Sequence, residues 1–453
     1  MTEAFIFDLQ KLTPSPLNAD LLIYCPFTSS RLLYVLKWIF TEQLDIAFRL
    51  TSNLEEWKRC EGPRINYDKD DHGQNSLRII PGSLLQEETI RKQELSINRW
   101  KHSTILFYNQ PGAPIPFDIF SAVFYLISRY EEYLPHEQDN HGRFKQEQSV
   151  AAQFSFLQQP VVDEWLMHFG EILVQKTGVK IKAKNFEFQP SYDVDIAWKY
   201  LHKGNKRLWG GYLKDVLTFN VKSVLERRAV LAGKQKDPYD CFTWLDEIHQ
   251  QHKLQPLYFL LLGKLSDYDK NADPALPAMQ KLMLDLSAQY DLGIHPSYGS
   301  HESANILKGE IDILVNATHK AITKSRQHYI KFTLPEAYEN LIAAGITDDY
   351  SMGYASGNGF RAGTSNSFPW YHLLKEQETG LRVHPFVFMD ATCRFYNKQS
   401  TQDAWQELER LWYAVKKVNG TFISIWHNHM LGNNNENKSW RELYLKTLKQ
   451  LAL

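Results

Sequence analysis

Apolar residues in the first part of the chain recur with two different periods. Short apolar runs, typical of buried strands, occur at 21–24 and 103–108, and three- and four-residue spacing, typical of amphipathic helices, occurs at 30–40, 119–133 and 161–174. The helix at 119–133 follows Pro116 and Asp118, which are common residue types where a helix begins. We therefore predict a small α/β domain of unknown role over residues 1–180.

From residue 181 onward the pattern changes to repeated units of an apolar strand, a polar loop and a helix. The expected strands are 186–191, 256–262, 292–295, 345–347, 383–389 and 422–426, and helical spacing lies between them, as at 277–290 and 404–418. Strands that alternate with helices favour a parallel sheet with helical crossovers. We predict that residues 181–453 form a distorted (β/α) barrel, a fold in which functional residues collect at the carboxyl ends of the strands.

Composition excludes several classes of protein. The 51 basic residues nearly balance the 52 acidic ones, so the molecule has no overall field that favours nucleic acid. No run approaches the roughly 18 apolar residues that a membrane-spanning helix needs. Residues 1–16 lack the basic start and continuous apolar centre of a secretory signal. We expect no nucleic-acid partner, no membrane span and a cytoplasmic location.

The one strong local charge bias lies between Lys199 and Lys236. Ten Lys and Arg residues there face only Asp215 and Glu226. Charge runs of this kind are usually solvated helix faces, and this is the interpretation we favour. Contact with an anionic glycan, a nucleotide-linked sugar or a membrane surface is the alternative.

The segment most suggestive of chemistry is Ser191-Tyr-Asp-Val-Asp195, where a strand leads into two carboxylates. Extended geometry would place Asp193 and Asp195 on the same side, because strand side chains alternate with a period of two. Two like charges in one site are unfavourable unless a metal ion or hydrogen-bond donors offset them. The pair therefore suits one metal ligand and one general base, or, alternatively, the capping of a following helix.

Ionisable side chains also follow later strand signals or a Gly-rich loop, and these are His295, Arg326, Arg361, Asp390 and His427. Each has an ordinary alternative, such as a hydrogen-bonded loop histidine or a surface ion pair. Together they are hard to explain by packing alone, because strands that are buried on both faces need no ionisable residue in the turns where they end. In a parallel barrel all of them would converge on one rim.

The order Asp-x-Asp, His, Arg, Asp, His on successive strands resembles the polysaccharide deacetylase superfamily (NodB homology, carbohydrate esterase 4). The resemblance covers roughly residues 185–453. It implies that Asp193 is the catalytic base, Asp195 and His295 are metal ligands, and His427 is the general acid. The segments 126–133 and 141–144 resemble an uncharacterised domain that precedes some deacetylase-like domains in Bacteroidetes-type proteins, which implies a bacterial, glycan-related setting.

One position departs from the family pattern. The second motif usually has two histidines four residues apart, but position 299 is Gly. His301 lies six residues after His295, about 240° further around a helix, so it could substitute only from a loop. His328 is the preferred third metal ligand. Ser300, water or a complete loss of metal binding are the alternatives.

The implied activity is metal-dependent removal of an N-acetyl or O-acetyl group from a carbohydrate. The expected metal is divalent, zinc above all, with nickel or cobalt as alternatives. Asp193 would take a proton from water and His427 would protonate the departing amine, while Arg361 or Arg326 and Asp390 orient these two groups.

Two other functions stay open at this point. A similar site could hydrolyse an amide that is not part of a sugar, because a fold does not dictate a substrate. Alternatively, a protein without metal could bind glycans or assist their assembly, with Trp370, Tyr371 and Trp426 stacking on sugars. The oligomeric state cannot be derived from the sequence.

Overall fold

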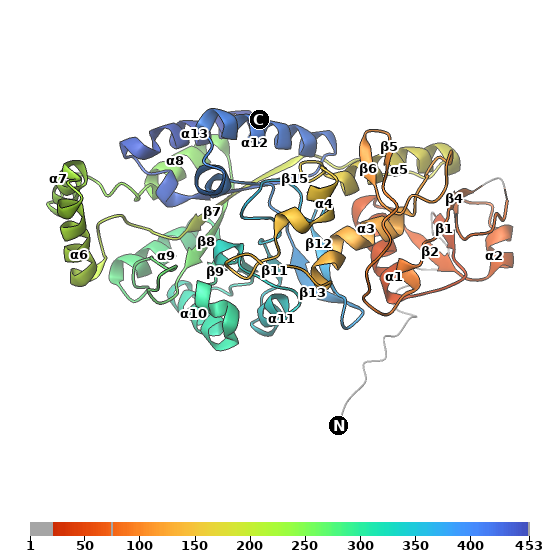
Figure 1. Cartoon of the computed structure of the whole chain (residues 1–453), viewed down its shortest axis with the longest axis horizontal. Coiled ribbons are helices and arrows are strands. Elements are labelled where there is room, and N and C mark those ends of the chain that lie inside the picture. Colours follow the sequence, from red (N-terminus) through yellow and green to blue (C-terminus); the bar gives the residue numbers. More distant parts are fainter. Residues whose placement is uncertain (1–20, 74–75, 452–453) are drawn as a thin grey trace, which may run out of the picture.

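The computed structural model describes residues 21–73 and 76–451, and it shows an elongated α/β molecule (Figure 1). Residues 1–16, in which we expected no secretory signal, lie outside the described residues. In the described part no helix combines the length and the apolar character needed to cross a membrane.

The first part of the chain contains a four-stranded parallel sheet in the order β2-β1-β3-β4, and a separate two-stranded hairpin. Its strands are β1 (Leu21–Tyr24), β2 (Phe48–Thr51), β3 (Arg64–Tyr67), β4 (Leu77–Ile79), β5 (Asn98–Trp100) and β6 (Ser103–Ile105). Its helices are α1 (Ser30–Leu36), α2 (Leu54–Arg59), α3 (Ile119–Ile127), α4 (Val150–Gln153) and α5 (Val161–Thr177). The predicted α/β character of this part is confirmed.

Two of the predicted helices in this part change their geometry along their length. The segment predicted at 30–40 continues beyond α1 as a π-helix, Lys37–Gln43. The segment predicted at 119–133 breaks after α3, because Arg129 adopts a left-handed conformation with φ 54°, and a 3-10 turn follows at Tyr130–Tyr133. The guanidinium of Arg129 is buried among Glu131, Glu132 and the carbonyl of Arg361, so a tertiary contact overrides the helical spacing.

The second part is built on a nine-stranded sheet in the order β12-β13-β11-β10-β9-β8-β7-β15-β14. The strands are β7 (Glu187–Val194), β8 (Leu257–Leu261), β9 (Asp291–His295), β10 (Lys324–Ser325), β11 (Asp348–Asp349), β12 (Phe368–His372), β13 (Gln377–Val383), β14 (Phe388–Met389) and β15 (Thr421–His427). The helices are α6 (Gly204–Leu217), α7 (Val221–Leu231), α8 (Phe242–His252), α9 (Pro277–Gln289), α10 (Ala304–Thr318), α11 (Glu336–Ala343), α12 (Thr401–Lys417) and α13 (Lys438–Leu451).

The strand pairings are parallel throughout this sheet except between β12 and β13. Parallel strands joined by helices were predicted, and this is confirmed. Closure into a barrel is not shown, because no ladder joins the edge strands β12 and β14 in the described residues. The predicted distorted barrel therefore stays a prediction, while the mixed α/β class is established.

The predicted strand at 383–389 is wrong, because the segment belongs to two strands. Strand β13 ends at Val383 and β14 starts at Phe388. Pro385 lies between them, and proline cannot donate the ladder hydrogen bond that a central strand needs. The backbone N–H of His384 instead bonds to the carbonyl of Asp349, 2.8 Å away. The strand predicted at 345–347 is also displaced, to Asp348–Asp349.

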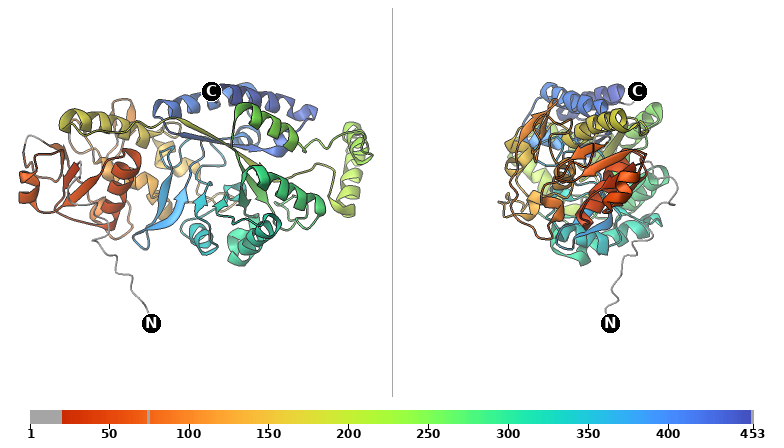
Figure 2. Two further views of the ribbon diagram at one scale, coloured as in Figure 1. Left: turned by 180° about the vertical axis from the view of Figure 1, so that it is seen from behind. Right: turned by 90° about the vertical axis from the view of Figure 1, so that its right-hand side faces the viewer.

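The two parts share one continuous hydrophobic core and many polar contacts. Asp163 on α5 accepts hydrogen bonds from the backbone N–H and the hydroxyl of Ser365, at 2.8 and 2.7 Å. The hydroxyl of Tyr34 on α1 donates to the carbonyl of Pro369, 2.7 Å away. The predicted boundary near residue 180 falls in the connection between α5 and β7, and the parts pack closely across it (Figure 2).

Candidate active site

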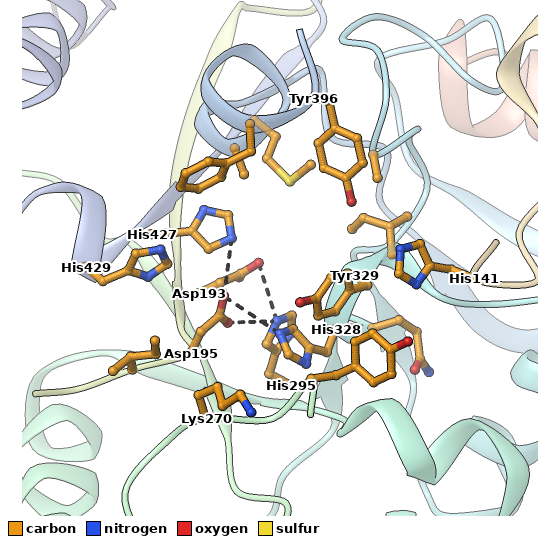
Figure 3. Close-up of a pocket in the computed structure, with 18 residues that line it drawn as sticks. His141, Asp193, Asp195, Lys270, His295, His328, Tyr329, Tyr396, His427 and His429 are labelled. Carbon is orange, nitrogen blue, oxygen red and sulfur yellow. Dashed lines mark ion pairs between the residues drawn. The ribbon is translucent and has the colours of Figure 1, made fainter. Parts of the chain in front are cut away.

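The carboxyl ends of five strands bring ionisable side chains to one pocket (Figure 3). Asp193 lies near the end of β7, directly opposite His427 at the end of β15. His295 ends β9, Arg326 follows β10 and Asp390 follows β14. These strands lie parallel, so their carboxyl ends meet at the same edge of the sheet. Local strand and loop signals thus place residues from five distant segments around one centre.

Asp195, His295 and His328 form a group that could hold a metal ion, with their candidate ligand atoms all within 4.8 Å of one another. Asp195 Oδ1 lies 3.2 Å from His295 Nε2, and Asp195 Oδ2 lies 3.8 Å from His328 Nε2. Tetrahedral bonds of about 2.1 Å would put ligand atoms roughly 3.4 Å apart. Asp195 Oδ1 is buried without a hydrogen-bond partner among the described residues, as expected of an oxygen that serves as a metal ligand.

Both histidines are held so that Nε2 faces the carboxylate. His295 Nδ1 contacts the backbone carbonyl of Arg326, which requires a proton on Nδ1 and leaves the Nε2 lone pair free. His328 Nδ1 lies 2.9 Å from Asp269 Oδ1. A second hydrogen bond to a carbonyl or carboxylate is the usual way in which metal-binding histidines are oriented. The three residues therefore fit a metal in donor type, in spacing and in their outer contacts.

The electrostatic balance at Asp195 also favours its charged form. Burial alone raises the pKa of this carboxyl, but the imidazoles of His328, His427 and His295, when protonated, outweigh that effect and hold the pKa well below its usual value. Asp195 is thus an anion at neutral pH, the form that binds a cation.

Asp193 is fixed by an arginine beneath it. Arg326 Nη1 donates to Asp193 Oδ1 at 2.8 Å, and Arg326 Nη2 donates to Ser191 Oγ at 2.8 Å. The guanidinium is fully buried and lies over the ring of Phe259, 4.2 Å from its centroid. Asp193 Oδ2 remains on the pocket side, 3.8 Å from His295 Nε2. One carboxylate oxygen is therefore anchored while the other is available for chemistry.

His427 stands across the pocket from the two histidines and is oriented by Asp390. Asp390 Oδ1 lies 2.6 Å from His427 Nδ1, and Asp390 Oδ2 accepts from the backbone N–H of His427 at 2.9 Å. Burial lowers the pKa of His427, but the carboxylates of Asp390 and Asp195 raise it to about 10. His427 Nε2 points into the pocket, 3.6 Å from Asp195 Oδ2. The ring can therefore carry a proton on the side that faces a substrate.

Arg361 does not line this pocket, so the hypothesis that it orients the catalytic pair is wrong, and of the two arginines considered Arg326 is the one that contacts Asp193. Its Nε and Nη2 donate to Glu132 at 2.9 and 2.6 Å, and its Nη1 donates to the carbonyl of Gly353 at 2.9 Å. These contacts join the two parts of the molecule. Arg361 is a structural residue of the interface between the two parts, because its Nε, Nη1 and Nη2 all donate hydrogen bonds there.

The other candidates for the third metal ligand lie outside the group. Ser300 donates its hydroxyl to the carbonyl of Ser297, 2.7 Å away. His301 is absent from the group that could hold a metal, which contains His328 instead. Gly299 sits in an exposed 3-10 turn with open space where a side chain would begin. His328 therefore stays the predicted third ligand, reached through a different strand from the family's usual position.

The three aromatic residues proposed for sugar stacking cannot take that role. Trp370, Tyr371 and Trp426 are all buried in the core, at 2%, 0% and 0% exposure. Aromatic rings that do face the pocket are Tyr268, Tyr329, Phe395 and Tyr396. Tyr268 stacks on Tyr298 with ring centroids 3.8 Å apart.

Several residues that line the pocket or contact its histidines were missed by the sequence reasoning. Asp269 and Lys270 lie in the loop after β8. Acidic residues follow this predicted strand in the sequence, and that pattern could have identified the loop. His429 lies two residues after His427, with its buried Nδ1 lacking a hydrogen-bond partner in the described structure. His141 comes from the first part of the chain, and its Nδ1 lies 3.1 Å from the hydroxyl of Tyr298. No local pattern identifies His141, because only tertiary packing brings its loop to the pocket.

Asp269→Asn is expected to weaken metal binding by about 10- to 100-fold, because the neutral amide orients and polarises His328 less well. The dissociation constant for zinc, measured by competition with a chelating dye, tests this. Asp267→Asn is the matched control, since Asp267 is exposed in the same loop. Equal affinities in the two variants would show that Asp269 does not support the metal site.

One family model and several solved structures are similar to parts of the chain. Residues 21–178 match the model of a family of unknown function, DUF7033. No curated protein matches the chain. Among solved structures, a candidate polysaccharide deacetylase of Mycobacterium smegmatis is 11% identical with TM-score 0.38, covering 60% of this chain and 90% of that one.

Two further solved structures are similarly distant. A polysaccharide deacetylase of Bacillus cereus is 12% identical with TM-score 0.30, covering 59% of this chain and 88% of its own. A PuuE allantoinase is 8% identical with TM-score 0.37, covering 58% and 85%. At these values the likenesses carry no argument about activity. The functional conclusion rests on the geometry of the site.

Proposed function

We propose that the protein is a metal-dependent hydrolase that removes an N-acetyl or O-acetyl group from a carbohydrate. The observation that carries the proposal is the grouping of Asp195, His295 and His328 between Asp193 and His427 in one pocket. A metal site, an anchored carboxylate and an oriented imidazole are the parts that hydrolysis of an amide or ester requires. Bacterial origin and a cytoplasmic location stay predictions from the sequence.

Asp195, His295 and His328 would hold the metal. Zinc suits this set best, because imidazole and carboxylate are common zinc ligands, and nickel or cobalt are the alternatives. When bound, such an ion polarises a carbonyl oxygen and lowers the pKa of a water molecule. The pocket leaves room beyond the three ligands, as a catalytic rather than a purely structural site requires.

The two remaining groups divide the proton transfers between them. Asp193 accepts the proton of the attacking water through Oδ2, since Oδ1 is bound by Arg326. His427 donates the proton on Nε2 to the leaving nitrogen or oxygen, and Asp390 holds the ring and stabilises its charge. Arg326 and Asp390 are positioning residues, because each acts through its partner.

The shape and lining of the pocket support a carbohydrate substrate. The cavity measures about 450 Å³, within the range for small-molecule sites. Tyr268, Tyr329 and Tyr396 line it, and flat faces with a polar tip suit the mixed apolar and hydroxyl surface of a sugar ring. His141 and Lys270 also line the pocket, on different sides of it, and add hydrogen-bond donors (Figure 3).

Metal analysis tests the proposal first. The purified protein, reconstituted with zinc and freed of excess, is expected to hold one ion per chain, and Asp195→Ala is expected to lose it. Asp312→Ala is the control, because Asp312 is an exposed residue of α10. A folded wild-type protein that takes up no metal would contradict the proposal.

Acetate release from a panel of N-acetylated and O-acetylated oligosaccharides then tests the reaction. Release that requires metal supports the carbohydrate substrate. Stoichiometric metal with no acetate release from any sugar would point instead to a different amide, because the site would be intact and the substrate wrong.

A further inference from the structure

Helices α6 and α7 form a hairpin at one end of the molecule, on the side opposite the first part of the chain (Figures 1 and 2). We define residues 204–231 as the basic hairpin. The two helices pack against each other, and a short turn through Phe219 joins them. This segment lies within the charge-biased region of the sequence, for which we favoured a solvated helix face.

The basic hairpin exposes many apolar side chains, which a solvated face does not explain. Eight of the twenty large hydrophobic side chains exposed in the described residues lie in it, so they are clustered rather than scattered singly. They are Trp209, Leu213, Val216, Leu217, Phe219, Val221, Leu225 and Leu231. On α6 their spacing is four, three and one residues, which forms one continuous stripe along the helix.

The tip carries the most exposed of these side chains. Phe219 is 88% exposed and adopts a left-handed conformation with φ 53°, an unfavourable one for a bulky residue. The turn is nevertheless well defined, because the backbone N–H of Phe219 bonds to the carbonyl of Val216 at 3.1 Å and the side chain of Asn220 caps α7. The turn therefore holds an aromatic ring in solvent.

The charge that remains unpaired on the basic hairpin is positive. Asp215 pairs with Arg227 at 2.6 Å, and Glu226 pairs with Lys199 at 2.9 Å, so both acidic groups are neutralised. Lys214, Lys222 and Arg228 are exposed, and none has an ion-pair partner in the part of the chain that the structure describes. Basic residues thus accompany the apolar stripe.

We infer that the basic hairpin binds the surface of an anionic membrane. An exposed apolar stripe with aromatic residues, accompanied by Lys and Arg, is the arrangement of helices that lie in the interfacial region of a bilayer. Trp209, Leu217 and Phe219 would enter the headgroup boundary. Lys214 and Lys222 would contact lipid phosphates, to which the positive charge is complementary. The inference is independent of the proposed reaction and concerns peripheral binding, not a membrane span.

The base of the basic hairpin is fastened to the active-site wall. Arg207 Nη1 and Nη2 donate to the carbonyls of Asn271 and Lys270, at 3.0 and 2.6 Å. Lys270 lines the pocket, and Asp269 beside it contacts His328. Binding through the hairpin would therefore keep the pocket close to the lipid surface.

Sedimentation with vesicles tests the inference on the full-length chain. The protein is expected to bind vesicles that contain about one third phosphatidylglycerol and not vesicles of pure phosphatidylcholine. Raising the salt from about 0.1 to 0.5 M is expected to weaken binding at least roughly 10-fold, because exposed charges are screened. Absence of binding to the anionic vesicles at the lower salt would overturn the inference.

The combined variant Trp209→Ser, Leu217→Ser and Phe219→Ser tests the apolar contribution. Binding to anionic vesicles is expected to fall at least about 100-fold, because the three most exposed apolar side chains of the hairpin are removed. The three side chains are largely exposed, so the thermal unfolding temperature is expected to change little. Unchanged vesicle binding in a folded variant would contradict the inference.

The combined variant Lys214→Glu, Lys222→Glu and Arg228→Glu tests the charges, with an expected loss of roughly 100-fold or more. Lys281→Glu with Lys308→Glu, on exposed faces of α9 and α10, is the matched control and is expected to bind nearly as the wild type does. Equal losses in both variants would overturn the assignment to the hairpin. A dimer that dissociates in the apolar variant, without vesicle binding by the wild type, would show that the hairpin docks on protein instead.

Discussion

Asp193→Asn is expected to lower kcat by about 10²- to 10⁴-fold, the usual contribution of a positioned general base. The amide has nearly the same shape, and its oxygen can still accept the hydrogen bond of Arg326 Nη1, now at 2.8 Å from Asp193 Oδ1. What it loses is the capacity to take a proton from water. Metal content is expected to stay at the wild-type level, since Asp193 is not one of the three grouped ligands.

The measurement is acetate release at saturating zinc and substrate, with metal content determined on the same samples. Asp348→Asn is a matched control, because Asp348 begins strand β11 of the same sheet and contacts His384 instead of the pocket. The thermal unfolding temperature shows whether the fold is retained when a neutral amide replaces the carboxylate beside Arg326. Activity of Asp193→Asn within about tenfold of the wild type would show that another group is the base.

Arg361→Met is expected to destabilise the folded protein by about 3–5 kcal/mol, because it leaves the charge of Glu132 buried with one partner fewer. The side chains of Arg361 and Glu132 are 2% and 3% exposed, and they form two hydrogen bonds across the two parts of the molecule. Arg129 still pairs with Glu132 in the variant, at 2.7 Å, which limits the loss.

Urea unfolding at neutral pH measures this effect. Arg382→Met is the matched control, because Arg382 also joins the two parts, through Glu42 at 3.0 Å, but is 37% exposed. Its loss is expected to stay below about 1 kcal/mol. Equal losses in the two variants would contradict the structural role assigned to Arg361.

The same ion pair predicts how the wild type responds to acid. Burial raises the pKa of Glu132, but the charges of Arg361 and Arg129 lower it to about 2. A carboxyl with a lowered folded-state pKa stabilises the protein above its unfolded-state pKa, about 4.5, and loses this contribution as the pH falls toward 2. The difference in stability between wild type and Arg361→Met should therefore shrink over that range.

Local patterns in the sequence located several of the elements that frame the site and the core. Apolar runs located β1, β7, β8, β9 and β15, and the three- and four-residue spacing located α5, α9 and α12 within a few residues. The predicted bounds of an element were wrong where a contact with a distant residue changed the local structure. The helix ending at Ile127 was overestimated because Arg129 turns toward Arg361, more than 200 residues away.

Part of the candidate site could also be predicted, because local patterns locate the strands and their ends. Asp193, Asp195, His295, Asp390 and His427 lie at or just after the carboxyl ends of strands, and the rule that parallel strand ends meet at one edge was enough to bring them together. The metal group also contains His328, which the sequence analysis preferred as the substitute for the missing histidine. The sequence left Ser300, water and a loss of metal binding open as alternatives, because the choice depends on which loop faces Asp195.

The sequence by itself determined the α/β class, the strands that carry Asp193, His295 and His427, and the basic character of residues 199–236. Only the tertiary structure decided that Arg326 rather than Arg361 anchors Asp193, that His141 reaches the pocket, and that the basic hairpin exposes its apolar stripe. The physical reason is that periodicity reports which face of an element is apolar, whereas the partner of that face, or the lack of one, is set by packing between residues far apart in the chain.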